Sequence, residues 1–363
     1  MTRQSDTISI NERPAKDLGI ELIRIISMFL IVCQHFLNHG AILKNAGENE
    51  FFLNLIHVLF APSVNLFVLI TGYFGVNTRR LKVKKGVELW LQVLFYSIVM
   101  LPIAAAFGAN ISNAYVYTRF APIIYRCYWF FSAYFILFLL IPFLSAMIGA
   151  ITKKQHLMLV IGIFVCAYLS TRFDITKVLS LANGYSVLWF IMLFCVGAYL
   201  RKYPIKIKRV YLIIAYLVTV VLHMVFRYYF NDTSKLVNLL IYCSTNYSDA
   251  LTLFAAVCIF LIFCGIKSNG SLLHRFICYI GGCTFGVYLF HEAPQFRGII
   301  YDKIFVTSKY WGHPQASLIV IGFSLILFTA GCAMESLRKL IFLAVKTVIA
   351  RIKKEMNTPE SEK

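Results

Sequence analysis

Long apolar runs are the feature of this sequence that most restricts its fold, because several exceed the roughly 18 residues that a bilayer crossing requires. The chain has 363 residues, of which 60% are hydrophobic and 14% are charged. No soluble domain or internal repeat is evident between the runs. Ten spans can be drawn, at residues 18–37, 55–75, 86–107, 128–148, 155–170, 186–200, 209–228, 247–266, 277–292 and 316–336. The sequence therefore predicts an all-α, polytopic membrane bundle of about ten transmembrane helices.

Basic residues predict how this bundle is oriented. The net charge is +19, and the lysines and arginines gather in clusters between the apolar runs, mostly on the face that carries the N-terminal tail. Cytoplasmic loops of membrane proteins are rich in these residues, so both termini are expected in the cytoplasm. The expected parts are a tail at 1–17, a transmembrane domain at 18–336 and a basic amphipathic tail at 337–363. We expect the last to lie on anionic membrane lipids rather than to bind a partner protein.

The composition disfavours two classes of ligand. The positive charge follows the topology pattern of a membrane protein, so it does not indicate nucleic acid binding. The ten cysteines lie mostly within apolar runs, with no Cys-x-x-Cys and no Cys/His spacing that resembles a zinc site. We therefore expect neither a nucleic-acid partner nor a bound metal.

The first apolar run includes ELIRIISMFLIVCQHFLNHG, residues 21–40, and carries three groups that are costly in hydrocarbon. Arg24 and His35 are eleven residues apart, so one helix face shows both, roughly 16 Å apart along the axis. Glu21 precedes Arg24 by three residues, at a spacing where the two can pair, or both can extend to interfacial water. His35 alone can be either a structural or a functional histidine.

A second histidine favours the functional interpretation of His35. The segment GGCTFGVYLFHEAPQFR, residues 281–297, lies in a span with the same predicted direction and brings His291 to a similar depth. The two histidines are therefore expected to face one cavity, with Glu292 and Arg297 beside them. The remaining histidines lack such a setting and are interpreted as loop, interface or packing residues: His39, His57, His156, His223, His274 and His313.

Further polar and aromatic residues are expected at the depth of His35. Asn65 lies near the start of the second span, Trp129 and Ser132 at the start of the fourth, and Trp189 near the start of the sixth. Tryptophans at this depth also form the interfacial belt of membrane proteins. Exposed aromatic rings are equally the surfaces on which sugar rings stack, so a polyol ligand is possible at this end.

A basic cluster, NTRRLKVKKG at residues 77–86, is expected at the opposite end. It follows Thr71-Gly72-Tyr73, where the glycine permits close backbone approach. Many such clusters only set topology. A phosphate-bearing ligand would find its best site here, because a guanidinium binds phosphate oxygens bidentately and several cations concentrate the field.

An ordered set of segments resembles the acyltransferase 3 family. Arg24 and His35 form an Arg-x10-His motif preceded by KDLGIELIR, and NLFVLITGYFG (65–75) is similar to the family's Phe-x-x-Ser-Gly-Phe segment. Similarity continues through YWFFSAYFILFLLIPFL (128–144), LWFIMLFCVGAYLRK (188–202) and FGVYLFHEAPQFR (285–297), over most of the chain. The family's common Arg-x-x-Arg after the second span is not present in that form, because Arg79-Arg80-Leu81-Lys82 stands there.

The resemblance implies an integral-membrane O-acyltransferase of the bacterial cytoplasmic membrane. It would transfer acetyl from cytoplasmic acetyl-CoA to a hydroxyl of a surface or lipid-linked polysaccharide. Arg24 would orient the donor or stabilise charge near its thioester, His35 would act as general base or as an acetyl-carrying nucleophile, and His291 would orient the acceptor or relay a proton. Donor binding is expected of Arg79, Arg80, Lys82 and Tyr73, and acceptor binding of Trp129, Ser132, Trp189, Asn65 and Arg297.

Two other functions compete with this one. A transporter or flippase for a glycan or anionic solute would also place arginine and histidine along a membrane path, but no pair of interrupted spans recurs in two halves of the sequence. A glycan polymerase is disfavoured by the short outer loops. Dependence on acetyl-CoA separates the acyltransferase from both. The sequence leaves open the acceptor sugar, the size of the acyl group and the oligomeric state.

Overall fold

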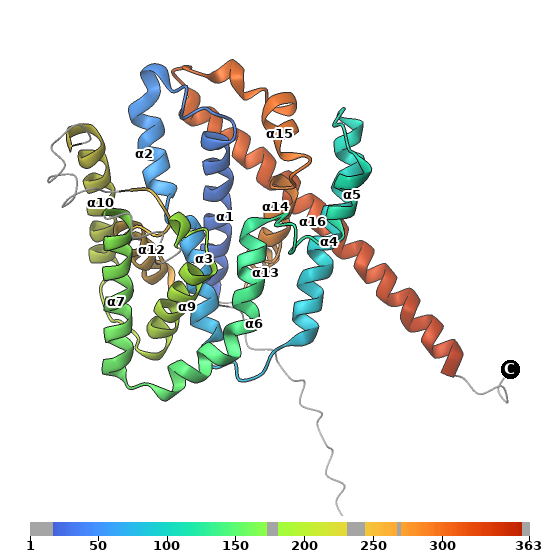
Figure 1. Ribbon diagram of the computed structural model, residues 1–363, viewed down its shortest axis with the longest axis horizontal. Helices are drawn as coiled ribbons and strands as arrows, with labels where there is room; N and C mark the ends of the chain where they lie inside the picture. Colours follow the sequence, from blue (N-terminus) through green and yellow to red (C-terminus); the bar gives the residue numbers. More distant parts are fainter. Residues whose placement is uncertain (1–16, 173–180, 231–243, 267–269, 358–363) are drawn as a thin grey trace, which may run out of the picture.

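The computed structural model describes residues 17–172, 181–230, 244–266 and 270–357, and within these ranges the regular structure is entirely helical (Figure 1). Short 3-10 and π turns join or extend several of the helices. The α-helices are α1 (Leu18–Asn38), α2 (Glu50–Phe60), α3 (Ser63–Gly75), α4 (Val83–Ala106), α5 (Asn113–Arg119), α6 (Trp129–Ala150), α7 (Lys153–Arg172), α9 (Val187–Lys202), α10 (Arg209–Val225), α12 (Ala250–Phe263), α13 (Leu272–Gly281), α14 (Thr284–His291), α15 (Arg297–Ile299) and α16 (Ala316–Asn357).

Seven helical segments in the described ranges are long and apolar enough to cross a membrane. They correspond to seven of the ten predicted spans, so the all-helical membrane fold is confirmed but the number ten is not. The other three predicted spans coincide with α7, α9 and α12. Of these, α9 has 16 residues and α12 has 14, which is shorter than a straight bilayer crossing needs.

Two of the predicted spans are broken helices. The second divides into α2 and α3 at Ala61-Pro62, where proline lacks the amide hydrogen that would continue the helix. The ninth divides into α13 and α14 at Gly282-Cys283. A hydropathy window averages over such short breaks, which is why the sequence alone showed continuous spans. Because two spans are interrupted, the absence of a recurring pair of interrupted spans from the sequence no longer counts against a transporter.

Helix α1 is the central element of the bundle (Figure 1). Asp17 caps it by accepting a hydrogen bond from the amide of Ile20 at 3.3 Å, and Glu21 in the first turn suits the helix dipole. The helix contacts α2, α3, α12, α13, α14 and α16. Its polar residues therefore meet other helices of the protein rather than only lipid.

The buried apolar residues form two large clusters. One surrounds α1, α4, α14 and the start of α16, and the other surrounds α3, α6, α9 and α12. Trp129, Phe130 and Tyr247 pack against both clusters, so they mark the seam between them. In the second cluster a Cβ on Gly72 would collide with the backbone of Phe194 in α9. This confirms the close backbone approach expected at Gly72, a common device in membrane helix packing.

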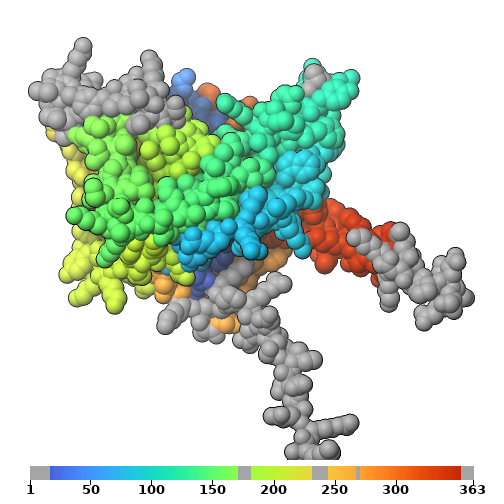
Figure 2. Space-filling view, turned by 60° about the horizontal axis from the view of Figure 1, so that its bottom comes forward, coloured from blue at the N-terminus to red at the C-terminus, as the bar shows by residue number. Residues whose placement is uncertain are grey.

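Helix α16 is continuous over 42 residues and has no break at residue 336. Its C-terminal part projects from the body of the molecule (Figure 2). The start of α1 and the end of α16 lie toward the same lower side in Figure 1. The lipid contact of this basic segment and the cytoplasmic placement of both termini stay predictions.

Candidate active site

His35 and His291 meet in the interior of the bundle. His35 Nδ1 lies 2.9 Å from His291 Nε2, and His291 Nδ1 lies 2.6 Å from the carbonyl oxygen of Val287. A carbonyl only accepts, so His291 carries its proton on Nδ1, and its Nε2 accepts from His35 Nδ1. In neutral His35 the proton is therefore on Nδ1, and Nε2 is unprotonated. Among the described residues, Nε2 has no hydrogen-bond partner. His35 is thus poised to accept a proton or to attack a carbonyl.

A buried carboxylate completes the cluster. Glu292, which is 4% exposed, places Oε1 3.2 Å from His35 Nδ1 and 3.3 Å from His39 Nε2. Its Oε2 accepts from Arg297 at 3.3 Å. A carboxylate beside Nδ1 stabilises the positive charge that His35 acquires when it takes a proton. His39 was grouped with loop and packing residues from the sequence, although its position four residues after His35 was the signal that the two share a helix face.

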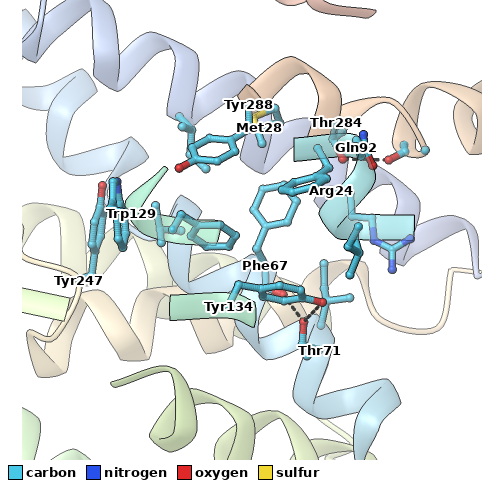
Figure 3. Close-up of a pocket in the computed structure, with 18 of the residues that line it drawn as sticks. Arg24, Met28, Phe67, Thr71, Gln92, Trp129, Tyr134, Tyr247, Thr284 and Tyr288 are labelled. Atoms are coloured by element: carbon cyan, nitrogen blue, oxygen red, sulfur yellow. Dashed lines mark hydrogen bonds between the residues drawn. The ribbon is translucent and has the colours of Figure 1, made fainter. Parts of the chain in front are cut away.

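A cavity of about 290 Å³, which we call the central cavity, is lined by both Arg24 and His35. The two residues are roughly 16 Å apart along α1, so the cavity extends along the middle of the bundle. In Figure 3, Arg24 lies on one side of the cavity and the rings of Trp129 and Tyr247 lie on the other. The wall is mainly apolar and aromatic, from Met28, Ile31, Val64, Ile70, Phe67, Leu89, Trp129, Phe130, Tyr134, Tyr247, Phe285 and Tyr288.

A second cavity, of about 140 Å³, adjoins the Arg24 end of the central cavity; we call it the basic pocket. The two share Arg24, Lys85, Ile70, Thr71 and Tyr134 in their walls. The basic pocket adds Arg80 and Lys82, so four cations surround it. Such a field suits a ligand with several phosphates.

The predicted donor-binding residues divide into two groups. Arg80 and Lys82 line the basic pocket, whereas Arg79 lies against Gly149 at the end of α6. Tyr73 lines neither cavity, and its hydroxyl accepts a hydrogen bond from Arg201 at 3.2 Å.

Glu21 pairs with Arg24 at 2.7 Å, as their spacing predicted. Lys85 belongs to the quoted basic cluster but was not singled out from the sequence.

The predicted acceptor-binding residues are also spread over different environments. Trp129 lines the central cavity. Asn65 and Trp189 are fully buried: Asn65 Oδ1 accepts from Trp189 Nε1 at 3.1 Å, and Asn65 Nδ2 donates to the carbonyl of Tyr247 at 2.8 Å. They therefore hold the backbone of a cavity residue rather than face a ligand. Ser132 donates to backbone carbonyl groups within its own region, and the side chain of Arg297 is 43% exposed beside Glu292.

The histidine cluster also has the composition of a metal site. Donor atoms of His35, His291 and Glu292 lie within 4.8 Å of one another, and two histidines with a glutamate are a donor set that catalytic zinc uses. Here the facing nitrogens of the histidines share a proton at 2.9 Å. The three side chains could hold a metal ion only if His35 Nδ1 gave up that proton.

Comparison with known proteins identifies the family of the chain. A family model described as an acyltransferase domain, that of the acyltransferase 3 family, matches residues 17–334. The searches of curated proteins and of solved structures found no match. The matched range contains both histidines, Arg24 and the basic pocket. Because it covers most of the sequence and the fold has several apolar helices of membrane-spanning length, the chain belongs to the acyltransferase 3 family and is a multi-pass membrane acyltransferase.

Proposed function

We propose that this protein transfers an acetyl group from acetyl-CoA to a hydroxyl of a surface or lipid-linked polysaccharide, in the bacterial cytoplasmic membrane. The observation that carries the proposal is the central cavity, which extends from the cations around Arg24 to His35. A donor with phosphates at one end and a reactive thioester at the other matches a cavity with these two ends.

The donor would bind from the basic pocket inward. Its phosphates would contact Arg80, Lys82 and Lys85, and the uncharged pantetheine arm would occupy the apolar central cavity. Arg24 lies roughly 16 Å along the helix from His35. It therefore orients the donor where the two cavities adjoin, and the thioester that reaches His35 lies beyond it.

The transfer step uses His35 as general base. Nε2 takes the proton from the acceptor hydroxyl while the hydroxyl oxygen forms a bond to the acetyl carbonyl carbon. The carbon–sulfur bond breaks, and the departing CoA thiolate receives the proton from His35. Glu292 stabilises the imidazolium between these events, and His291 fixes the orientation of the ring through the bond at 2.9 Å. In the alternative route, Nε2 attacks the acetyl carbonyl carbon and the carbon–sulfur bond breaks, which leaves acetyl-His35 and the CoA thiolate. The acceptor hydroxyl oxygen then attacks the same carbon, the carbon–nitrogen bond breaks, and the hydroxyl proton ends on the CoA thiolate.

The competing proposal is transport of a glycan or an anionic solute through the central cavity. It explains Arg24 and His35 as substrate-path residues. The transport proposal gives no role to the unprotonated Nε2 of His35, whose ring is held by His291 and Glu292. The two proposals differ in their need for acetyl-CoA, because a transporter would ignore it.

The test uses a bacterial host whose surface glycan lacks base-labile acetyl groups. Wild type, His35→Ala and the control His313→Ala are expressed to equal membrane levels, and the glycan is examined by NMR. His313 is exposed in the turn before α16, away from the cluster. We expect O-acetyl signals with wild type and the control and none with His35→Ala. Full acetylation by His35→Ala would refute the role of His35, and no signal from any of the three would refute acetyl transfer to this glycan.

A further inference from the structure

A third cavity, of about 160 Å³, lies near the C-terminal end of α1. Its volume is about ten times the roughly 10–15 Å³ that a single water needs in this measure, so it can admit a ring-sized ligand. We call it the amide pocket. Its wall comes from α1, α2 and the segments before α9 and α12: Gln34, Asn38, His57, Ala61, Tyr185, Thr245, Asn246 and Tyr247.

Two buried polar atoms in this wall lack a partner among the described residues. Gln34, which is 7% exposed, donates from Nε2 to the carbonyl oxygen of His57 at 2.8 Å, and its Oε1 is buried without a hydrogen bond. The accepting carbonyl settles which end of the amide is which, because only the NH₂ group can donate to it. His57 is bonded through Nε2 to Thr245 Oγ1 at 3.0 Å, and its Nδ1 is buried and unpaired. Buried polar atoms of this kind are costly unless a ligand or water satisfies them.

The amide pocket contains no charged side chain among the described residues that line it. Three side-chain amides, one imidazole, a threonine hydroxyl and two tyrosines supply both donors and acceptors. This chemistry suits a ligand with many hydroxyl groups and no net charge. A phosphate or a carboxylate would lose its hydration there without gaining an opposite charge.

Aromatic rings connect this pocket to the site of transfer. Tyr247 lines both the amide pocket and the central cavity, and its ring is stacked on Trp129 at 6.2 Å between centroids and 12° between planes. Figure 3 shows these two rings side by side at the edge of the central cavity. Tyr185 adds a third ring, 4.3 Å from Trp129. Gln34 is the residue directly before His35 on α1, so the pocket lies at nearly the same depth along the helix as the proposed catalytic histidine.

We infer that the amide pocket is the acceptor subsite and that it binds an uncharged sugar ring, with Gln34 Oε1 accepting a hydrogen bond from a sugar hydroxyl. This inference rests on the proposed function and specifies the acceptor class of that same site. The stacked rings of Trp129 and Tyr247 form the surface along which the sugar reaches His35. The pocket thus separates recognition of the acceptor from binding of the donor.

The test measures sugar binding directly, with protein in lipid nanodiscs so that no sugar-headed detergent competes. Saturation-transfer NMR is recorded with methyl β-D-glucoside, methyl β-D-galactoside and methyl N-acetyl-β-D-glucosaminide, and with methyl β-D-glucuronide as the charged counterpart. The variants are Gln34→Met, which keeps the length of the side chain, and Asn246→Ala in a loop. Gln315→Met is the matched control, because Gln315 is exposed just before α16.

Binding of at least one neutral glycoside by wild type is expected, with weaker binding of the glucuronide. Gln34→Met should weaken it by about fivefold to tenfold, the loss typical of one buried hydrogen bond, and Asn246→Ala should weaken it in the same direction. The control should bind as wild type does. Equal binding by wild type and both variants, preference for the glucuronide, or no neutral binding at all would each overturn the inference.

A second readout keeps this result separate from the proposed function. Release of CoA from acetyl-CoA into water, without a sugar, depends on the donor side only. It should be unchanged in the control Gln315→Met, and CoA release by Gln34→Met at any measurable rate shows that this variant is folded. If wild type binds a neutral glycoside but never releases CoA, the proposed acetyl transfer is wrong while the sugar site stands. If CoA is released and the variants bind sugar normally, the sugar site is wrong while acetyl transfer stands.

Discussion

The basic pocket and the amide pocket lie toward opposite ends of α1 and differ in the chemistry of their walls. Four cations surround the first, whereas the described wall of the second is uncharged and holds two unpaired polar atoms. Each adjoins the central cavity, through Arg24 in one case and Tyr247 in the other. Under the proposed function, a single helix therefore contributes to two separate binding sites, one for the phosphates of the donor and one for the hydroxyl groups of the acceptor, and it also carries His35.

The largest effect expected is on chemistry, independent of either pocket. His35→Gln should lower kcat by about 10²–10⁴-fold, the usual contribution of a general base. The KM values for acetyl-CoA and for the acceptor should change little, because both pockets keep their walls. Steady-state kinetics in nanodiscs measures this. A raised KM for acetyl-CoA with an unchanged kcat would mean that His35 binds the donor. Donor binding would then not be confined to the basic pocket and the apolar wall of the central cavity.

The same variant decides how the acetyl group travels. Wild type is mixed with labelled acetyl-CoA in the absence of acceptor, quenched and digested. Label on the α1 peptide of wild type but not of His35→Gln would establish an acetyl-histidine intermediate. Absence of label from wild type that still releases CoA would favour direct transfer, as proposed above.

The second prediction concerns the basic pocket alone. Arg80→Gln combined with Lys82→Gln should raise the KM for acetyl-CoA by about tenfold or more, because charge-assisted contacts with phosphates are lost. The difference from wild type should shrink at high salt, where exposed charges are screened. Sugar binding in the amide pocket should not change.

The matched control for that variant is Lys153→Gln with Lys154→Gln. Both lysines are exposed at the start of α7, outside the basic pocket, and the change in net charge is the same. An equal rise of KM in the control would mean that general electrostatic attraction, rather than the pocket, binds the donor.

The basic pocket and the amide pocket also differ in how far they can be predicted from the sequence. The basic pocket draws three of its cations from one short segment, 80–85, and Arg24 and His35 follow from the period of one helix. The meeting of His35 with His291 could be predicted because both spans run in the same direction. Such features depend on local geometry and on depth, which a sequence encodes directly.

The amide pocket depends on contacts between distant segments, which the sequence does not encode in any local pattern. Gln34 becomes significant only because His57, from another helix, supplies the carbonyl that fixes its amide. The roles of Asn65 and Trp189 were equally hidden, because each satisfies the other in the interior. Glu292 was placed near the site from the sequence, but its direct contacts with His35 and His39 depend on the turn after α14.

A third prediction concerns the buried pair of Asn65 and Trp189, which lies beside the amide pocket residue Tyr247. Asn65→Leu should destabilise the protein by roughly 1–3 kcal/mol for each buried group left unpaired, Trp189 Nε1 and the carbonyl of Tyr247. Thermal unfolding in nanodiscs measures this, with exposed Asn113→Leu as the control. Because Tyr247 loses its anchor, sugar binding should weaken while release of CoA is kept. Loss of CoA release with sugar binding intact would mean that the pair supports the donor side instead.

The smallest effect is expected from removal of metal, and it tests the region between the pockets. His35, His291 and Glu292 have the composition of a zinc site, but the proton shared at 2.9 Å holds His35 in the form with a bare Nε2. Treatment with EDTA followed by desalting should therefore leave transfer and CoA release unchanged, and added zinc should inhibit by displacing that proton. His39→Ala, which removes one partner of Glu292 but leaves the histidine pair, is the matched variant and should retain the insensitivity to EDTA. Loss of activity with EDTA and its recovery with zinc would show that the reactive group is a metal-bound species. The comparison of the cationic pocket with the neutral pocket would then have to include the charge of a metal ion between them.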